Sequence, residues 1–119
     1  MRSYKLVMPG DLNHFGFLFG GNLLKWVDEV SWIAACRDFP ACRFVTIAMD
    51  HVEFRKSVQG GTILAVDAEL AKRGLTSVAY RVEVFRNRLG SGSDEKVFTT
   101  TVTLVRVDEE GRKVSLPPA

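Results

Sequence analysis

Asp28 is the residue whose type and position in this sequence most suggest chemistry. It stands in the middle of the run Asn22 to Cys36, whose apolar spacing predicts a helix. On that helix the neighbours of Asp28 are Leu24, Ser31, Trp32 and Ala35. A carboxylate costs several kcal/mol to bury unless it is hydrogen-bonded or paired. Asp28 is therefore either a catalytic carboxylate or an edge residue that is hydrated or paired with Lys25, one turn back.

A glycine pair at the start of the same helix offers a second part of a site. The N–H groups of Gly20 and Gly21 would lack partners within the helix, and the helix dipole favours negative charge there. Such groups can hold the oxyanion that forms when a carbonyl is attacked, although a tight turn alone also explains the glycines. Asn13 precedes them on a loop and supplies both a donor and an acceptor. About two helical turns separate Gly20 from Asp28, so both can face one cleft.

Other polar residues carry weaker signals. His14 and His51 have no Cys or Asp at metal-ligand spacing, so no metal site is expected. Glu29 lies four residues after Lys25 and is expected to form a solvated helix pair with it. Asp50 is expected to be a bulge or interface residue. The absence of a Gly-x-Ser-x-Gly motif argues against a serine hydrolase.

The composition is that of an ordinary globular chain. The 119 residues are 46% hydrophobic and 25% charged, which excludes a disordered chain, and no apolar run is long enough to cross a bilayer. Basic and acidic residues alternate to a net charge of +2, without the basic stripe typical of nucleic-acid binding. With no leader segment evident, Cys36 and Cys42 are expected to be free thiols in a cytoplasmic protein, folded as one domain over residues 1–119.

Alternating apolar residues predict strands around the helix. We expect one short strand at Tyr4–Met8 and four more at Arg43–Arg55, Thr62–Ala71, Ser77–Arg86 and Lys96–Val107. The apolar parity switches near Asp50 and His51, which favours a β-bulge. Turns or loops are expected at Gly60–Gly61, Lys72–Thr76, Asn87–Glu95 and Asp108–Gly111. The order predicts an α+β protein in which four consecutive strands form an antiparallel meander that curls around one helix.

The helix is expected to be buried nearly all round. Leu23, Val27, Val30 and Ala34 fall on one face, and two tryptophans with Ile33 widen the apolar surface. A sheet around one helix keeps free edges, which invite pairing with a second subunit. We therefore expect a two-fold homodimer with a continuous sheet.

The run from Asn13 to Glu29, NHFGFLFGGNLLKWVDE, resembles the signature of hotdog-fold acyl-CoA thioesterases of the YciA and cytosolic acyl-CoA hydrolase group. Their pattern is an Asn, a Gly three residues on, a Phe/His-Gly-Gly triplet and an Asp in the following helix. Val45–Phe54 is similar to the family's second strand, and Lys72–Ser77 resembles its hairpin near the coenzyme. The resemblance extends from about Tyr4 to Val107.

The resemblance implies a hotdog fold, one long central helix wrapped by a five-stranded antiparallel sheet, and hydrolysis of acyl-coenzyme A to a free acid and CoA. Asp28 corresponds to the family's catalytic carboxylate, as general base or as nucleophile, and Asn13 to its polar partner from the opposite subunit. Gly20 or Gly21 falls where helix-start amides would hold the thioester oxygen. Coenzyme A is part of the substrate, so neither a cofactor nor a metal is expected. Such dimers commonly assemble further into hexamers, as trimers of dimers.

Six residues are expected to bind the coenzyme: Arg55, Lys56, Arg73, Gly74, Thr76 and Ser77. The family often has Arg-Pro where this chain has Arg55-Lys56-Ser57, Gly-Asp where it has Gly60–Gly61, and Arg where it has Leu75. Two other functions fit the same fold: a dehydratase, for which His14 is misplaced, and a non-catalytic acyl-CoA-binding or regulatory protein. The acyl group itself is not fixed by the sequence, because the pocket depends on residues such as Phe15, Phe17 and Trp32.

Overall fold

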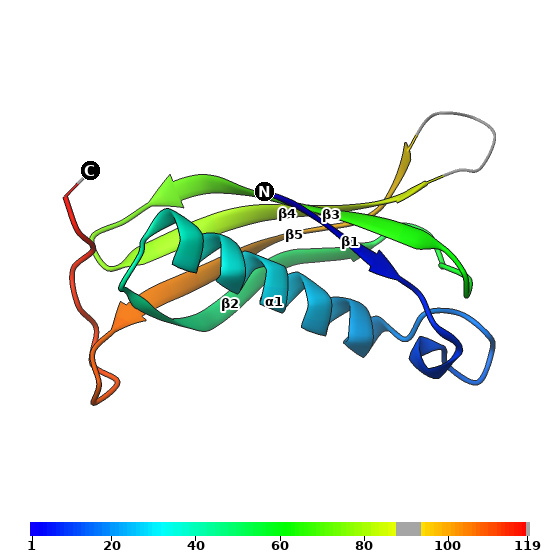
Figure 1. Ribbon diagram of the computed structural model, residues 1–119, viewed down its shortest axis with the longest axis horizontal. Coiled ribbons are helices and arrows are strands. Elements are labelled where there is room, and N and C mark those ends of the chain that lie inside the picture. The colour runs from blue at the N-terminus through cyan, green and yellow to red at the C-terminus, as the bar shows by residue number, and fades with distance from the viewer. Residues whose placement is uncertain (88–93, 119) are drawn as a thin grey trace.

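The computed structural model describes residues 1–87 and 94–118, and one long helix lies across one face of a five-stranded antiparallel sheet (Figure 1). The elements are β1 (Arg2–Leu6), a short 3-10 helix η1 (Pro9–Asp11), α1 (Gly20–Asp38), β2 (Arg43–Phe54), β3 (Ile63–Arg73), β4 (Ser77–Asn87) and β5 (Asp94–Val107). The predicted α+β class, with a single long helix and five strands, is confirmed.

The strand order is β1-β3-β4-β5-β2, and it corrects the predicted meander. Strands β3, β4 and β5 do follow one another, but β2 pairs with β5 instead of with β3. The connection from β2 to β3 is too long for a tight hairpin and is held across the end of the sheet. There the N–H of Leu18 donates to the carbonyl of Val58 at 2.7 Å, and that of Gly61 donates to Val7 at 2.8 Å. Strands β1 and β2 are therefore the two edges.

The core lies between α1 and the sheet. The predicted apolar face is confirmed, because Leu23, Val27, Val30 and Ala34 are all buried. They pack against the inner side of the sheet, where Tyr80, Phe98 and Leu104 are fully buried. Burying such side chains contributes roughly 1.5–3 kcal/mol each, which makes this seam the main source of stability.

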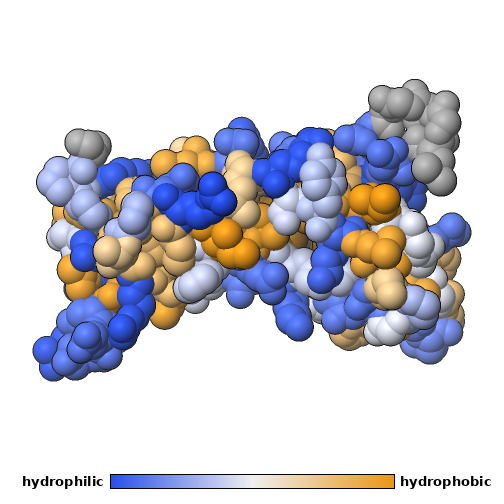
Figure 2. Space-filling view, viewed as in Figure 1, coloured by the Kyte–Doolittle hydropathy of each residue, from blue (hydrophilic) through white to orange (hydrophobic). Residues whose placement is uncertain are grey.

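The helix is not wrapped all round, contrary to the sequence-based expectation. Lys25, Glu29 and Trp32 are exposed, because the sheet covers only one side of α1. Patches of hydrophobic residues remain on this face of the molecule among hydrophilic ones (Figure 2). None of the helices in the described part of the chain is long and apolar enough to span a membrane.

Strand β2 is irregular where the parity switch predicted a bulge. Its pairing with β5 shifts between Asp50 and Glu53, and His51 has a φ of +57°, in the left-handed region. A second shift lies between Thr46 and Ala48. At the end of the strand, the half-exposed ring of Phe54 meets the buried ring of Phe98 edge-on at 5.0 Å.

The turns fall close to the predicted places. The hairpin between β3 and β4 is closed by the N–H of Gly74, which donates to the carbonyl of Ser77 at 2.8 Å. A Cβ on Gly74 would stand 2.8 Å from the Ser77 hydroxyl, so a larger residue there would displace that side chain. Of the expected loop at Asn87–Glu95, positions 88–93 lie outside the described residues, and its two ends belong to β4 and β5.

Candidate active site

Asp28 is half-buried on the side of α1 that faces β2. Its Oδ1 accepts a hydrogen bond of 2.5 Å from the hydroxyl of Thr46, which lies on β2. Its backbone carbonyl accepts a second hydrogen bond, of 2.9 Å, from the buried hydroxyl of Ser31. Among the described residues no ion pair joins Asp28 to Lys25, so the expected alternative pairing does not form.

The hydrogen bond from Thr46 fixes Oδ1 of Asp28 and leaves the other carboxylate oxygen, Oδ2, free. Within the described part of the chain, Oδ2 of Asp28 has no protein partner. A carboxylate held in this way can accept a proton from water or attack an electrophilic carbon. The sequence reasoning missed Thr46, because a threonine in a strand pattern is ordinary strand propensity and nothing local reveals what its hydroxyl faces.

Asn13 shapes the loop that precedes the helix. Its Oδ1 accepts hydrogen bonds from the N–H groups of Phe15 and Phe17, at 2.9 and 3.2 Å, and its own N–H donates to the carbonyl of Phe17 at 2.7 Å. Gly16 takes a φ of +87° in this turn, which favours glycine. The side-chain NH₂ of Asn13 has no partner in the described structure, and Asn13 makes no hydrogen bond to Asp28 within one chain.

The helix starts with two unpaired amides, as predicted. Phe19 is the N-cap and provides no side-chain hydrogen bond. The N–H groups of Gly20 and Gly21 have no partner among the described residues. Unpaired amides at a helix start, together with the helix dipole, favour negative charge nearby. A Cβ on Gly21 would lie 2.8 Å from the Phe19 ring, so a larger residue there would displace that ring.

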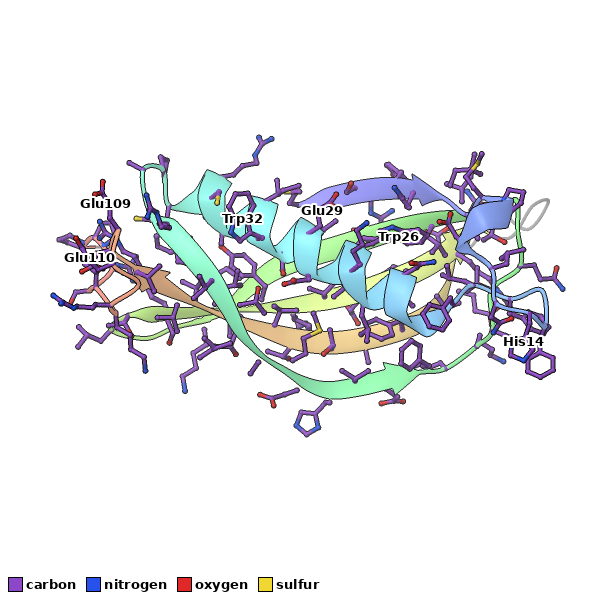
Figure 3. The ribbon with its side chains drawn as sticks, turned by 90° about the horizontal axis from the view of Figure 1, so that it is seen from below. His14, Trp26, Glu29, Trp32, Glu109 and Glu110 are labelled. Atoms are coloured by element: carbon purple, nitrogen blue, oxygen red, sulfur yellow. The ribbon has the colours of Figure 1, made fainter. Side chains whose placement is uncertain are left out.

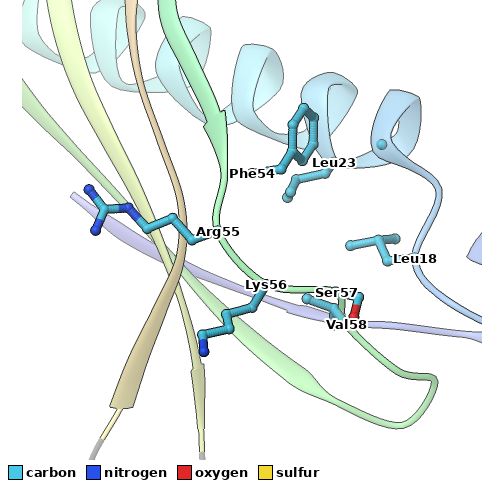
Figure 4. Close-up of a pocket in the computed structure, with 8 residues that line it drawn as sticks. Leu18, Leu23, Phe54, Arg55, Lys56, Ser57 and Val58 are labelled. Atoms are coloured by element: carbon cyan, nitrogen blue, oxygen red, sulfur yellow. The ribbon is translucent and has the colours of Figure 1, made fainter.

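A pocket of about 340 Å³ opens beside this helix start (Figure 4). Its apolar lining comes from Leu18, Leu23, Phe54 and Val58, and its polar lining from Gly20, Arg55, Lys56 and Ser57. Arg55 pairs with Glu53 at 3.4 Å and Lys56 with Glu95 at 3.7 Å. The Arg55–Glu53 pair is exposed, and such pairs are worth about 0–1 kcal/mol, so an anionic ligand can replace Glu53 beside Arg55 at little cost.

The structure brings together only part of the predicted site. Gly20, Arg55 and Lys56 share the pocket, whereas Asp28 is not among its lining residues and lies about 12 Å further along the helix axis. The expected coenzyme residues of the β3–β4 hairpin lie at the other end of a molecule 45 Å long, beside the end of α1. There the Arg73 guanidinium stacks 5.1 Å from the Phe39 ring.

The histidines take no part in this arrangement. His14 is exposed, and its ring lies tilted against that of Phe15 with the ring centres 4.0 Å apart; His51 is exposed at the β2 bulge. Figure 3 shows His14 at the end of the molecule where α1 begins, far from Glu109 and Glu110. In residues 1–87 and 94–118, no group of three or more His, Cys, Asp and Glu side chains could hold a metal ion.

With this fold and geometry, the chain matches the family model described as the thioesterase superfamily over residues 15–92. The protein belongs to that superfamily. The resemblance found in the sequence and the hotdog fold that it implied are therefore confirmed.

Individual relatives make the match more specific. An uncharacterized acyl-CoA thioester hydrolase of Zymomonas mobilis is 34% identical over 95% of this chain and 75% of its own length. Acyl-CoA thioester hydrolase YciA of Escherichia coli is 31% identical over 94% of this chain and 86% of its own.

Solved structures agree with the sequence comparison. The hexameric thioesterase of Yersinia pestis superposes with a TM-score of 0.89 at 29% identity, over 98% of this chain and 93% of that one. An acyl-CoA hydrolase of Staphylococcus aureus, solved with butyryl coenzyme A, coenzyme A and coenzyme A disulfide, superposes with a TM-score of 0.90 at 27% identity, over 98% and 71%.

Proposed function

We propose that this protein hydrolyses the thioester of acyl-coenzyme A to a free acid and CoA. The observation that carries the proposal is the Asp28 carboxylate, half-buried on the central helix and oriented by the Thr46 hydroxyl, in a chain of the thioesterase superfamily. The relatives in that superfamily that are named acyl-CoA thioester hydrolases support the substrate class.

The chemistry needs a base, a water and a place for developing negative charge. As general base, Asp28 removes a proton from a water molecule while the oxygen of that water attacks the thioester carbon. As nucleophile, the Asp28 carboxylate attacks the thioester carbon itself, and water then cleaves the resulting anhydride. The unpaired amides at Gly20 and Gly21 stabilise the oxyanion, and Asn13 orients the water or the thioester through its free NH₂. The C–S bond breaks and CoA leaves as a thiolate, a good leaving group that needs no strong acid.

A second copy of the chain completes the site in this proposal. Strand β2 is an unpaired edge, and its outward side chains Val45 and Ile47 are 44% and 56% exposed. If two β2 edges pair antiparallel about a two-fold axis, the start of one strand lies opposite the end of the other. That pairing moves the pocket and Asn13 of one protomer toward Asp28 of its partner. We propose this dimer as the minimal active unit, with further assembly into a hexamer like that of the Yersinia thioesterase.

The same pairing accounts for the separated coenzyme residues. In one chain, Lys56 and the β3–β4 hairpin lie at opposite ends of the sheet. In the antiparallel dimer, the hairpin of the partner lies at the same end as Arg55 and Lys56, three strands away. At about 4.8 Å per strand this is a span of roughly 14 Å, over which the phosphates of one coenzyme can meet cations from both protomers.

Structures of variants of the Staphylococcus hydrolase support the choice of residues. An asparagine, an aspartate and a threonine of that enzyme have each been replaced by alanine. The asparagine and the aspartate stand 15 positions apart, as Asn13 and Asp28 do. The threonine follows the aspartate by 17 positions there, and Thr46 follows Asp28 by 18 here.

The test is a thiol-release assay with butyryl-CoA on the purified protein and two carboxylate variants. Asp28→Asn should lower kcat by roughly 100-fold or more, the scale of a lost general base, with oligomer size and Tm unchanged. Glu29→Gln, the neighbouring exposed carboxylate, is the matched control and should keep at least about half of the activity. A wild-type protein that binds CoA without turnover would instead be the non-catalytic binding protein. Full activity of the Asp28→Asn variant would refute the proposed role of Asp28 in catalysis.

A further inference from the structure

Trp32 is an exposed indole that is held in one orientation. The other tryptophan of the helix, Trp26, is 7% exposed, whereas Trp32 is 45% exposed. Its Nε1–H donates to the backbone carbonyl of Phe44 at 3.1 Å. This bond ties the ring to the start of β2 without covering it. An aromatic face that is both exposed and fixed is suited to contact a ligand, because little side-chain entropy is lost on binding.

The indole stands next to the proposed catalytic carboxylate. Trp32 follows Asp28 by one turn of α1, and Phe44 precedes Thr46 by two residues of β2, so both pairs lie on the same sides of their elements. The Asp28–Thr46 and Trp32–Phe44 hydrogen bonds thus join α1 to β2 at two successive positions along the helix. The rise between them is about 6 Å along the helix axis. A group held at Asp28 and extending toward the end of the helix meets the indole next.

The surroundings of Trp32 favour an uncharged group over the coenzyme. Its helix neighbours include the carboxylates of Asp28 and Glu29, which repel phosphates, and Cys36, a free and half-buried thiol. Figure 3 shows Glu29 and Trp32 close together on α1. Within one chain, Arg55, Lys56 and the unpaired amides lie instead around the pocket at the helix start.

We infer that Trp32 limits the length of the acyl group that this protein accepts. The inference rests on the proposed acyl-CoA hydrolysis, and it names the substrate class as short-chain acyl-CoA. An extended alkyl chain advances about 1.25 Å per C–C bond, so about six carbons span the rise of about 6 Å from Asp28 to Trp32 along the helix axis. Longer chains must bend or displace a ring that is tied to the sheet.

The experiment compares kcat/KM over an acyl-CoA series from acetyl to lauroyl for three proteins. The wild type should lose efficiency steeply beyond about six carbons. Trp32→Ala removes the indole that longer chains would meet. It should raise kcat/KM for octanoyl- and lauroyl-CoA by about tenfold relative to butyryl-CoA, because the additional methylenes can then be buried. Trp32→Phe, the matched control, keeps a ring but loses the N–H, and should retain most of the preference for short chains.

Inhibition by CoA, which has no acyl group, separates the acyl site from the coenzyme site. Wild type and Trp32→Ala should be inhibited by CoA equally. Weaker inhibition of the variant, or a loss of activity by the same factor at every chain length, would place the indole against the coenzyme and overturn the inference. Dissociation of the oligomer in Trp32→Ala, seen by light scattering, would also overturn it. A wild type that hydrolyses none of the series would refute the proposed function itself.

Discussion

Removing the Thr46 hydroxyl isolates the contribution of one hydrogen bond to the proposed chemistry. Thr46→Val is nearly isosteric and suits a strand, but it cannot donate to Oδ1 of Asp28, where the wild type makes a bond of 2.5 Å. A hydrogen bond to a charged group is worth about 1.5–3 kcal/mol. If that energy holds the carboxylate in its reactive orientation, kcat should fall by about 10- to 150-fold. KM should change little, because Thr46 does not contact the expected coenzyme residues.

Two further variants distinguish positioning from folding. Thr46→Ser keeps the donor and should recover most of the lost kcat. Thr101→Val makes the same change in β5, at a half-buried threonine whose hydroxyl has no side-chain hydrogen bond in the described structure. That control should keep wild-type kcat. Steady-state kinetics with butyryl-CoA, beside Tm measurements, provide the assay. A folded Thr46→Val protein with kcat within about twofold of wild type would refute the positioning role.

Three more predictions concern assembly, coenzyme binding and stability. Inactive Asn13→Ala and Asp28→Asn chains, co-expressed and purified as doubly tagged heterodimers, should regain close to half of the wild-type activity; heterodimers as inactive as their parents would mean that the site is not shared. Lys56→Ala combined with Arg73→Ala should raise KM for acyl-CoA more than it lowers kcat, and an unchanged KM would place the phosphates elsewhere. Burial raises the pKa of Tyr80 above its usual value near 10, and the 2.8 Å hydrogen bond from its hydroxyl to Asp38 raises it further. The neutral phenol therefore stabilises the fold below about pH 10, and this contribution is lost as the pH rises above that value. Tyr80→Phe should therefore lower Tm at pH 8, and its deficit should shrink toward pH 11; a constant deficit would show that the phenol does not ionise on unfolding.

The local elements could be predicted because their patterns are local. The spacing of Leu23, Val27, Val30 and Ala34 specified the buried face of α1, and it needed no knowledge of what would cover it. The bulge at His51 followed from a change of parity within one strand. Gly74 marked the hairpin between β3 and β4, because glycine is a common turn residue between two strand patterns.

The pairing of β2 could not be predicted from such patterns. Neighbouring strands usually pair, so the meander was the natural expectation for four consecutive strands. The choice of β5 depends on the connection after Phe54, whose hydrogen bonds reach Leu18 and Val7, residues far away in the sequence. The same non-local placement hid the role of Thr46 and left Trp32 exposed on a helix whose composition favoured complete burial.

The position of the carboxylate explains why the proposed mechanism calls for a second copy of the chain. Asp28 is held at the seam between α1 and an unpaired edge strand, while the pocket with its cations and free amides opens at the helix start, about 12 Å away along the axis. A rigid helix cannot close that distance within one chain. An antiparallel β2–β2 contact can, because it reverses one helix relative to the other and sets the start of one strand beside the end of the next. In the proposed dimer, the edge that would otherwise invite aggregation becomes the element that assembles the site.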